Sequence, residues 1–156
     1  MQMLSNFGVK CKYTLLNGIG CLLSQTTKVF IGADYVLGNG GIVSCVGSSM
    51  IAFLASQFKV PVIVWCETYK FTERVNLDQI KNNQMGDPRE IVNNYLLPFD
   101  QKFKDKMLHQ KNLDVRYLKY DFTPMSCVNM ILCEVGRISP VSVPVIVKEF
   151  KEDEKT

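Results

Sequence analysis

Two apolar runs on either side of a helix-like segment constrain the fold of this chain more than any other feature. Residues 28–32 and 60–66 are rich in β-branched and aromatic side chains, which is typical of strands buried on both faces. Residues 47–58, which lie between them, begin with a glycine and two serines and continue with apolar residues at helical spacing. A strand, a helix and a second strand in this order predict a βαβ unit with parallel strands. We therefore expect an α/β fold built around a parallel sheet.

The length and composition of the chain indicate one domain. With 156 residues, of which 47% are hydrophobic, the chain can bury one substantial core. We expect a single domain over residues 1–150, with a charged insertion at about 98–112 and a charged tail at 151–156. The insertion interleaves lysine with aspartate, which favours an exposed, partly mobile segment over a nucleic-acid surface.

Charge, cysteine and histidine content exclude several classes of function. The net charge of +3 is small and the basic residues are scattered, so the sequence predicts neither direct nucleic-acid binding nor membrane binding. The six cysteines form no CxxC pair and lie in apolar runs, which indicates reduced thiols in a cytoplasmic protein. Because His109 is the single histidine, we expect no metal site, and we expect no cofactor.

The segments outside the βαβ unit give weaker predictions. Their apolar patterns are short, so each is assigned by spacing alone. We expect a strand at 8–14, a helix weakened by two glycines at 15–24, a strand at 113–120, a helix at about 125–135, and a final apolar run at 141–150 that forms an edge strand or is covered by a partner.

A candidate ligand site follows the first predicted strand. Asp34 comes at the carboxyl end of this strand, which is the edge at which open α/β sheets bind ligands. The glycine-rich turn with Asn39 and Gly40, together with the helix start at Gly47 and Ser48, could place backbone amides around an anion. Two plainer interpretations stay open. Asp34 could cap a helix or bond to its own turn, and the glycines could simply supply a positive φ.

Two groups of side chains are candidates for a partner interface. Tyr69 and Phe71 lie in the polar and aromatic segment 67–75, where they could anchor a partner, although an ordinary surface loop with salt bridges has the same composition. Val143 and Val145 lie in the final apolar run, and a strand there would expose one of its faces to a partner.

Several segments taken together resemble one protein family. They are IGADYVLGNGG at 31–41, VGSS at 46–49 and YDFTP at 120–124. The family contains sugar-phosphate aldose–ketose isomerases and the regulatory alpha, beta and delta subunits of the guanine-nucleotide exchange factor for eukaryotic translation initiation factor two. The similarity covers about residues 8–147, and PVIVWCETYKFTERV at 61–75 looks most like the delta type.

The resemblance implies a Rossmann-like α/β domain, with a mostly parallel sheet and helices on both faces, that forms the C-terminal half of a longer subunit. In the isomerases, the aspartate that matches Asp34 is a general acid/base, and its partner cysteine lies upstream of the part matched here. Their Asn-Lys pair is replaced by Ser44 and Cys45, which removes a cation that holds the phosphate. Isomerisation of a sugar phosphate needs an acid, a base and such cations, so we expect no catalytic residue and only a vestigial ligand site.

The resemblance therefore implies a non-catalytic regulatory and structural subunit of the nucleotide-exchange complex. Such a subunit would assemble with the related alpha, beta, gamma and epsilon subunits and would sense the phosphorylation of translation initiation factor two. Expressed alone, it is expected to self-associate, for instance as a homodimer. Two alternatives are a sensor that binds a sugar phosphate or nucleotide through Asp34, Asn39 and the helix start at Gly47, and an active sugar-phosphate isomerase.

Overall fold

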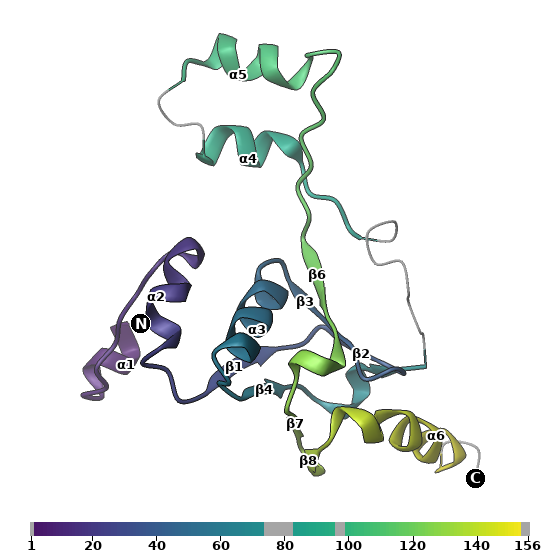
Figure 1. Cartoon of the computed structure of the whole chain (residues 1–156). Helices are drawn as coiled ribbons and strands as arrows, with labels where there is room; N and C mark the ends of the chain where they lie inside the picture. The colour runs from purple at the N-terminus through teal and green to yellow at the C-terminus, as the bar shows by residue number, and fades with distance from the viewer. Residues whose placement is uncertain (1, 74–82, 96–98, 154–156) are drawn as a thin grey trace.

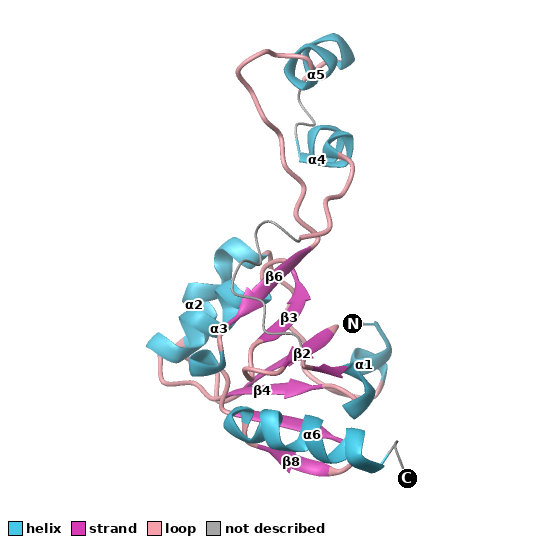
Figure 2. Cartoon of the chain, turned by 90° about the vertical axis from the view of Figure 1, so that its right-hand side faces the viewer, coloured by secondary structure: helices cyan, strands magenta, loops and turns pink. Residues whose placement is uncertain are grey.

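The chain forms a body of two small sheets surrounded by helices, from which a helical arm projects (Figure 1). The computed structural model describes residues 2–73, 83–95 and 99–153. The view in Figure 2 shows the strands of the body on edge and the arm extending away from them.

The first sheet contains the predicted βαβ unit. Three of its strands are parallel, and the last strand is antiparallel to its neighbour. Val29 pairs with Val62, and Ile63 pairs with Met130. The predicted strands at 28–32 and 60–66 and the helix at 47–58 are thus confirmed. In spatial order the strands are β1 (Val29–Gly32), β4 (Val62–Trp65), β7 (Met130–Cys133) and β8 (Gly136–Ile138), and the helix is α3 (Ser48–Gln57).

A second, mixed sheet follows β1 in the chain. Its centre is an antiparallel hairpin, and one further strand pairs with each side of this hairpin. The hairpin lies between β1 and α3 in sequence, where the amino-acid pattern predicted only a loop. The α/β class is confirmed, but the strands are divided between two sheets. The order of the second sheet is β5 (Phe71–Thr72), β2 (Tyr35–Leu37), β3 (Ile42–Cys45) and β6 (Tyr120–Thr123).

One hydrophobic cluster joins both sheets to the helices around them. Ile31, Val64 and Ile131 are register neighbours on one face of the first sheet, and Ala52 and Ala55 of α3 belong to the same cluster. Complete burial of an aliphatic side chain of this size contributes about 1.5–3 kcal/mol. The cluster also includes residues of the last helix, α6 (Val143–Asp153), which lies in front of the first sheet in Figure 2.

The remaining elements of the body are short. The predicted helix at 15–24 appears as a 3-10 turn followed by a helix of five residues, in keeping with its two glycines. Within the described ranges, no helix is both long enough and apolar enough to cross a membrane. The short elements are α1 (Gln2–Asn6), α2 (Ile19–Leu23) and the 3-10 turns Leu16–Gly18, Thr68–Lys70, Met125–Cys127 and Pro140–Ser142.

Two predictions of secondary structure near the C-terminus are wrong. The segment 125–135 is a 3-10 turn followed by strand β7, because its apolar residues fill a place between β4 and β8 that helical spacing does not reveal. The run 141–150 lies in helix α6 instead of an edge strand, although it is rich in valine. Val143, Ile146 and Val147 share one face at helical spacing and pack on the core, and packing outweighs their β propensity.

Two predicted strands also differ from the structure. The strand predicted at 8–14 is absent, since this segment pairs with no strand among the described residues and leaves Val9 and Tyr13 exposed. The strand expected at 113–120 begins only at Tyr120, and an isolated bridge between Met85 and Leu118 precedes it.

The insertion predicted at about 98–112 contains the second helix of a helical hairpin, and the first helix precedes it. Helices α4 (Pro88–Tyr95) and α5 (Gln101–Leu108) contact each other, and both figures show them away from the body. Asp100 caps α5 through a hydrogen bond from the backbone amide of Phe103 at 2.8 Å. The single-domain prediction for residues 1–150 stays a prediction.

Candidate functional site

The five residues of the predicted ligand site lie at opposite ends of the β2–β3 hairpin. Asp34 precedes β2, and Gly47 and Ser48 follow β3, so these three residues lie at the open end of the hairpin. Asn39 and Gly40 form the turn at the other end. The structure therefore does not bring the five residues together around one ligand.

The glycine-rich turn is explained by chain geometry. The backbone amide of Gly41 donates to the Asn39 Oδ1 atom at 3.1 Å, which is an Asx-type turn. Gly40 has a φ of 75°, and a Cβ atom there would collide with the carbonyl oxygen of Pro140. The plainer interpretation of a turn that requires positive φ fits these contacts, and the turn packs against the segment before α6.

The start of α3 is occupied by a carboxylate of the same chain. Asp121 of β6 accepts hydrogen bonds from the backbone amides of Gly47, at 2.7 Å, and Ser49, at 3.1 Å. An aspartate at this position caps the helix and complements its dipole. The expectation that these amides are open to an external anion is therefore wrong for Gly47 and Ser49. No local pattern predicts this contact, because Asp121 lies more than seventy residues away in the chain.

Asp121 belongs to a partly desolvated polar face under α3. Burial raises the pKa of the Asp121 carboxyl above its ordinary value, and the two amide donors oppose this rise. Ser44 pairs with Asp121 in the β3–β6 register, and Thr123 pairs with Ile42. Both hydroxyl oxygens, Ser44 Oγ and Thr123 Oγ1, are buried without a hydrogen-bond partner among the described residues.

Asp34 has a different environment. Its backbone amide donates to the carbonyl oxygen of Val43 at 2.9 Å, and its side chain is half-buried. Within residues 2–73, 83–95 and 99–153, no donor is placed on its carboxylate. Asp34 is therefore not the cap of a helix, and its side chain is available at the carboxyl end of β1.

Lys70, which is not among the predicted site residues, contacts the backbone of Ala33, the residue before Asp34. Lys70 Nζ donates to the carbonyl oxygen of Ala33 at 3.1 Å and forms an ion pair of 2.8 Å with Glu67. The hydrogen bond between these side chains raises the pKa of Lys70 and lowers that of Glu67. Glu134 holds the same loop by accepting from the amide and hydroxyl of Thr68. The only signal in the sequence was the cluster of charges in segment 67–75.

The cysteines offer no activated nucleophile by their geometry. Burial, with a smaller effect of Cys133, raises the pKa of the Cys66 thiol to about 12, which leaves the thiol protonated at neutral pH. Cys45 is exposed at the end of β3, and Ser44 beside it is buried. Neither side chain can supply the positive charge that a phosphate contact requires.

The four predicted interface residues have different exposures. Tyr69 and Val145 are exposed, and Phe71 is partly buried against the core. Val143 is fully buried, so its assignment to a partner interface is wrong. It lies at the start of α6 on the face that packs inward, whereas Val145 lies on the outer face.

The first sheet has an open apolar face that the sequence did not indicate. Phe30 and Trp65 are 57% and 56% exposed, and their rings meet edge to face at 5.9 Å. Parallel sheets are normally covered on both faces. Alternation along β1 and β4 places these rings opposite the buried Ile31 and Val64, so the face can receive another protein surface.

A family assignment follows from the sequence as a whole. The family model described as the initiation factor 2 subunit family matches residues 1–140. The chain belongs to this family. The resemblance drawn from the motifs is thereby confirmed.

Relatives of both kinds expected in this family are similar to the chain. The translation initiation factor eIF2B subunit delta of Dictyostelium discoideum is 40% identical over 94% of this chain and 24% of its own length. The ribose 1,5-bisphosphate isomerase of Pyrococcus furiosus is 30% identical over 94% of this chain and 42% of its own length. The chain thus spans less than half the length of these relatives.

Solved structures share the fold. The 5-methylthioribose 1-phosphate isomerase of Pyrococcus horikoshii OT3 has a TM-score of 0.74 at 18% identity, covering 96% of this chain and 39% of that chain. A chain of the tetrameric eIF2B-beta2-delta2 complex from C. thermophilum has a TM-score of 0.68 at 20% identity, covering 95% and 39%. The predicted Rossmann-like α/β class is confirmed.

Proposed function

We propose that this chain is part of a non-catalytic regulatory and structural subunit, of the delta type, in the exchange complex that acts on translation initiation factor two. In this role it assembles with alpha, beta, gamma and epsilon subunits in the cytoplasm and helps the complex to sense the phosphorylation of initiation factor two. The observation that carries the proposal is the 40% identity to a delta subunit along 94% of the chain. The similarity to the isomerase over the same share is lower, at 30%.

The chemistry of the candidate site supports a non-catalytic role. The Asp121 carboxylate occupies two of the amides at the start of α3, where it would repel a phosphate. Lys70 is already paired with Glu67, so its charge is partly neutralised. Asp34 provides one carboxylate, whereas proton transfer between neighbouring carbons requires both an acid and a base.

The open face of the first sheet supports assembly with other subunits. Exposed Phe30 and Trp65 lie side by side, and large aromatic residues are enriched at interfaces. One of the solved structures with this fold is a tetrameric complex of beta and delta subunits, and we infer a similar association here.

Co-expression of the full-length subunit with a beta-type subunit tests the proposal. We expect the subunit alone to self-associate and the pair to sediment as one stable complex. Trp65→Ser should weaken this complex, whereas Tyr13→Ser, a control at another exposed aromatic residue, should not. The proposal would be overturned if the subunit sedimented as a monomer at high concentration and formed no complex with the beta-type subunit.

A sensor without turnover is the second candidate, and the half-buried Asp34 carboxylate, which has no donor among the described residues, favours it. Calorimetric titration of the full-length protein with a panel of sugar phosphates and nucleotides tests this function. The candidate predicts saturable heat that Asp34→Asn abolishes. A flat response to every compound would exclude it.

An active isomerase is the least supported candidate. It predicts turnover of ribose 1,5-bisphosphate or methylthioribose 1-phosphate by the full-length protein, with loss of activity in Asp34→Asn. We expect no turnover, because Ser44 and Cys45 supply no cation and Lys70 is already paired with Glu67.

A further inference from the structure

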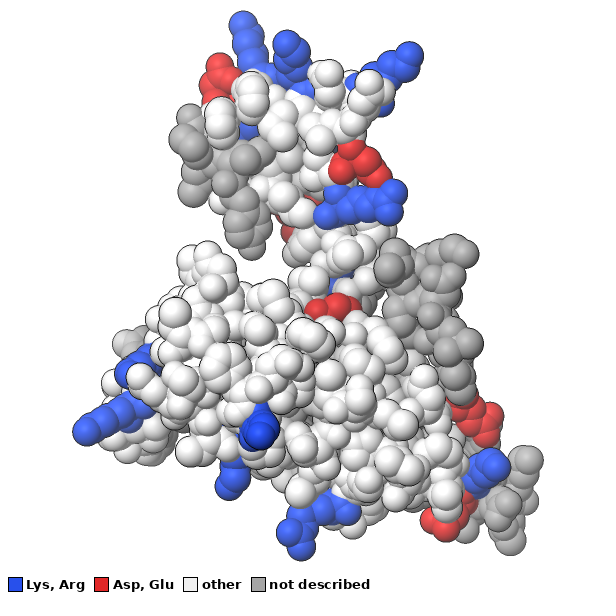
Figure 3. Space-filling view, in the orientation of Figure 1, with Lys and Arg blue, Asp and Glu red and all other residues white. Residues whose placement is uncertain are grey.

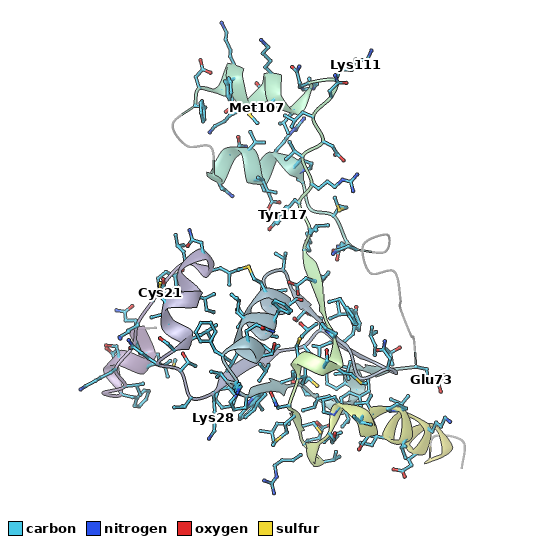
Figure 4. The ribbon with its side chains drawn as sticks, in the orientation of Figure 1. Cys21, Lys28, Glu73, Met107, Lys111 and Tyr117 are labelled. Carbon is cyan, nitrogen blue, oxygen red and sulfur yellow. The ribbon has the colours of Figure 1, made fainter. Side chains whose placement is uncertain are left out.

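The arm is held away from the body by a defined two-stranded stalk. The backbone amide of Gly86 donates to Tyr117 at 2.8 Å, and that of Lys119 donates to Gln84 at 3.2 Å. A Cβ atom at Gly86 would collide with the Tyr117 ring, so the two strands of the stalk approach closely. Figure 4 shows Tyr117 at the stalk and Lys111 at the outer end of the arm. These contacts hold the two chain segments of the stalk together at the base of the arm.

The inner face of the arm uses a lysine where an apolar residue is usual. Val92 of α4 and Lys104 of α5 are buried, and Lys104 Nζ reaches the carbonyl oxygen of Asn93 at 3.5 Å. The stem of a lysine can pack as an apolar chain while its ammonium group keeps a polar partner. The arm therefore buries a charged residue next to α4.

The outer face of the arm exposes two aromatic residues. Phe99 and Phe103 are 44% and 42% exposed, and their rings stack with centroids 4.6 Å apart. Lys102 and Lys106, which are four residues apart on α5, are exposed next to Phe103, and Phe99 lies just before the helix N-cap at Asp100. Figure 3 shows basic side chains projecting from the end of the arm that points away from the body. We call these four residues the arm stripe.

The partition of side chains between the inside and the outside of the arm does not favour its stability. Burying Lys104 and exposing Phe103 is the reverse of the usual partition between interior and surface. An exposed apolar patch with a charged rim is typical of a binding surface.

We propose that the arm stripe docks on an acidic protein surface that has an apolar socket for the two phenyl rings. The proposal goes beyond the subunit role, which does not depend on the arm. The ammonium groups of Lys102 and Lys106 lie beside the ring pair, and they are complementary to carboxylates around an apolar hollow. Complementary charges of this kind determine which partner binds and in which orientation. Nucleic acid fits less well. The two phenyl rings stack on each other and so already cover one face each, which leaves less aromatic surface on which bases could stack.

Photo-crosslinking of the full-length protein in its own cells tests this inference. p-Benzoylphenylalanine replaces Phe103 in one variant and Leu113, another exposed position of the arm, in a control. Mass spectrometry then identifies the linked peptide. We expect position 103 to link to one protein, at a site with several aspartate or glutamate residues, and position 113 not to do so.

Charge reversal separates docking from accidental contact. Lys102→Glu with Lys106→Glu should reduce the crosslink at least about tenfold, and lysines placed on the linked acidic site should restore it. Lys111→Glu with Lys119→Glu makes the same charge change off the stripe and should leave the crosslink intact. Co-purification with the beta-type subunit checks that each variant folds. A link to RNA, a link to a neutral surface, insensitivity to the reversal or no link from position 103 would each overturn the proposal.

Discussion

The body and the arm differ in the side chains that they bury. In the body, Val62, Val64 and Ile131 lie inside, and the carboxylate of Asp121 is used to cap a helix. In the arm, Lys104 lies inside, and Phe99 and Phe103 lie outside. Burial of aliphatic side chains stabilises the body, whereas burial of the charged Lys104 adds little hydrophobic stabilisation to the arm. The arm lies within the residues that the family model matches, and we infer that contacts with a partner shape its outer face.

The largest effect should come from the core of the body. Ile131→Ala removes a fully buried side chain between β4 and β8, and we expect it to lower the free energy of unfolding by about 2–5 kcal/mol. Val135→Ala, in the exposed turn after β7, should change it by less than about 0.5 kcal/mol. Urea denaturation followed by circular dichroism measures both. Equal effects would mean that the body is not organised around this sheet.

The next effect concerns the hairpin turn that resembled a ligand loop. Gly40→Ala should cost about 1–3 kcal/mol, because the residue has a positive φ and its Cβ would strike the Pro140 carbonyl. Gly20→Ala in α2 meets no neighbouring atom and should stabilise the chain by about 0.5–1 kcal/mol. Thermal unfolding of the two variants distinguishes a structural glycine from a tolerated one. If Gly40→Ala were neutral, the turn would need another explanation.

Substitution of Asp121 should change the free energy of unfolding less than the two preceding substitutions, and its effect should depend on pH. Asp121→Ala should cost about 0.5–2 kcal/mol through loss of the cap, whereas Asp121→Asn keeps an acceptor and should cost less. Because burial raises the folded-state pKa of Asp121, the folded chain binds its proton more tightly than the unfolded chain. The contribution of this titration is therefore greatest below the ordinary value of 3.8 and declines as the pH rises through the folded pKa.

Glu134 provides a control, because its pKa is shifted in the opposite direction from that of Asp121. Its hydrogen bond from Thr68 lowers its pKa, so its contribution is present above the ordinary value and is lost as the pH falls through the folded pKa. Urea midpoints between pH 3 and pH 7 should show opposite changes in slope for Asp121→Asn and Glu134→Gln. Parallel changes in the two variants would contradict the assignment of burial as the dominant cause at Asp121.

The sequence predicted the part of the fold that depends on local pattern. The runs at 28–32 and 60–66 and the helix between them follow from burial and spacing, and each is present. Strand β7 was missed because its neighbours β4 and β8 decide its conformation, and α6 was missed because valine favours strands when read alone.

The candidate site was less predictable because its decisive contacts are long-range. Asp34 could be placed at the end of β1 from the order of residues alone. The cap from Asp121 and the approach of Lys70 to Ala33 connect segments that only the folded sheet brings together. Residue types suggested a ligand site, but the structure separates its residues between the two ends of the hairpin and places Asp121 on two amides at the start of α3.

The smallest effect tests the arm directly. Lys104→Met keeps the length of the side chain and removes its charge, so we expect a neutral or stabilising change of at most about 1 kcal/mol. The exposed control Lys102→Met should also leave stability nearly unchanged, but it should weaken crosslinking from position 103. Hydrogen exchange of the α4 and α5 amides measures the local effect better than global unfolding, since the arm contacts the body little. Faster exchange in Lys104→Met would show that the buried ammonium group stabilises the arm, and its inverted arrangement would then have a structural cause within the arm itself.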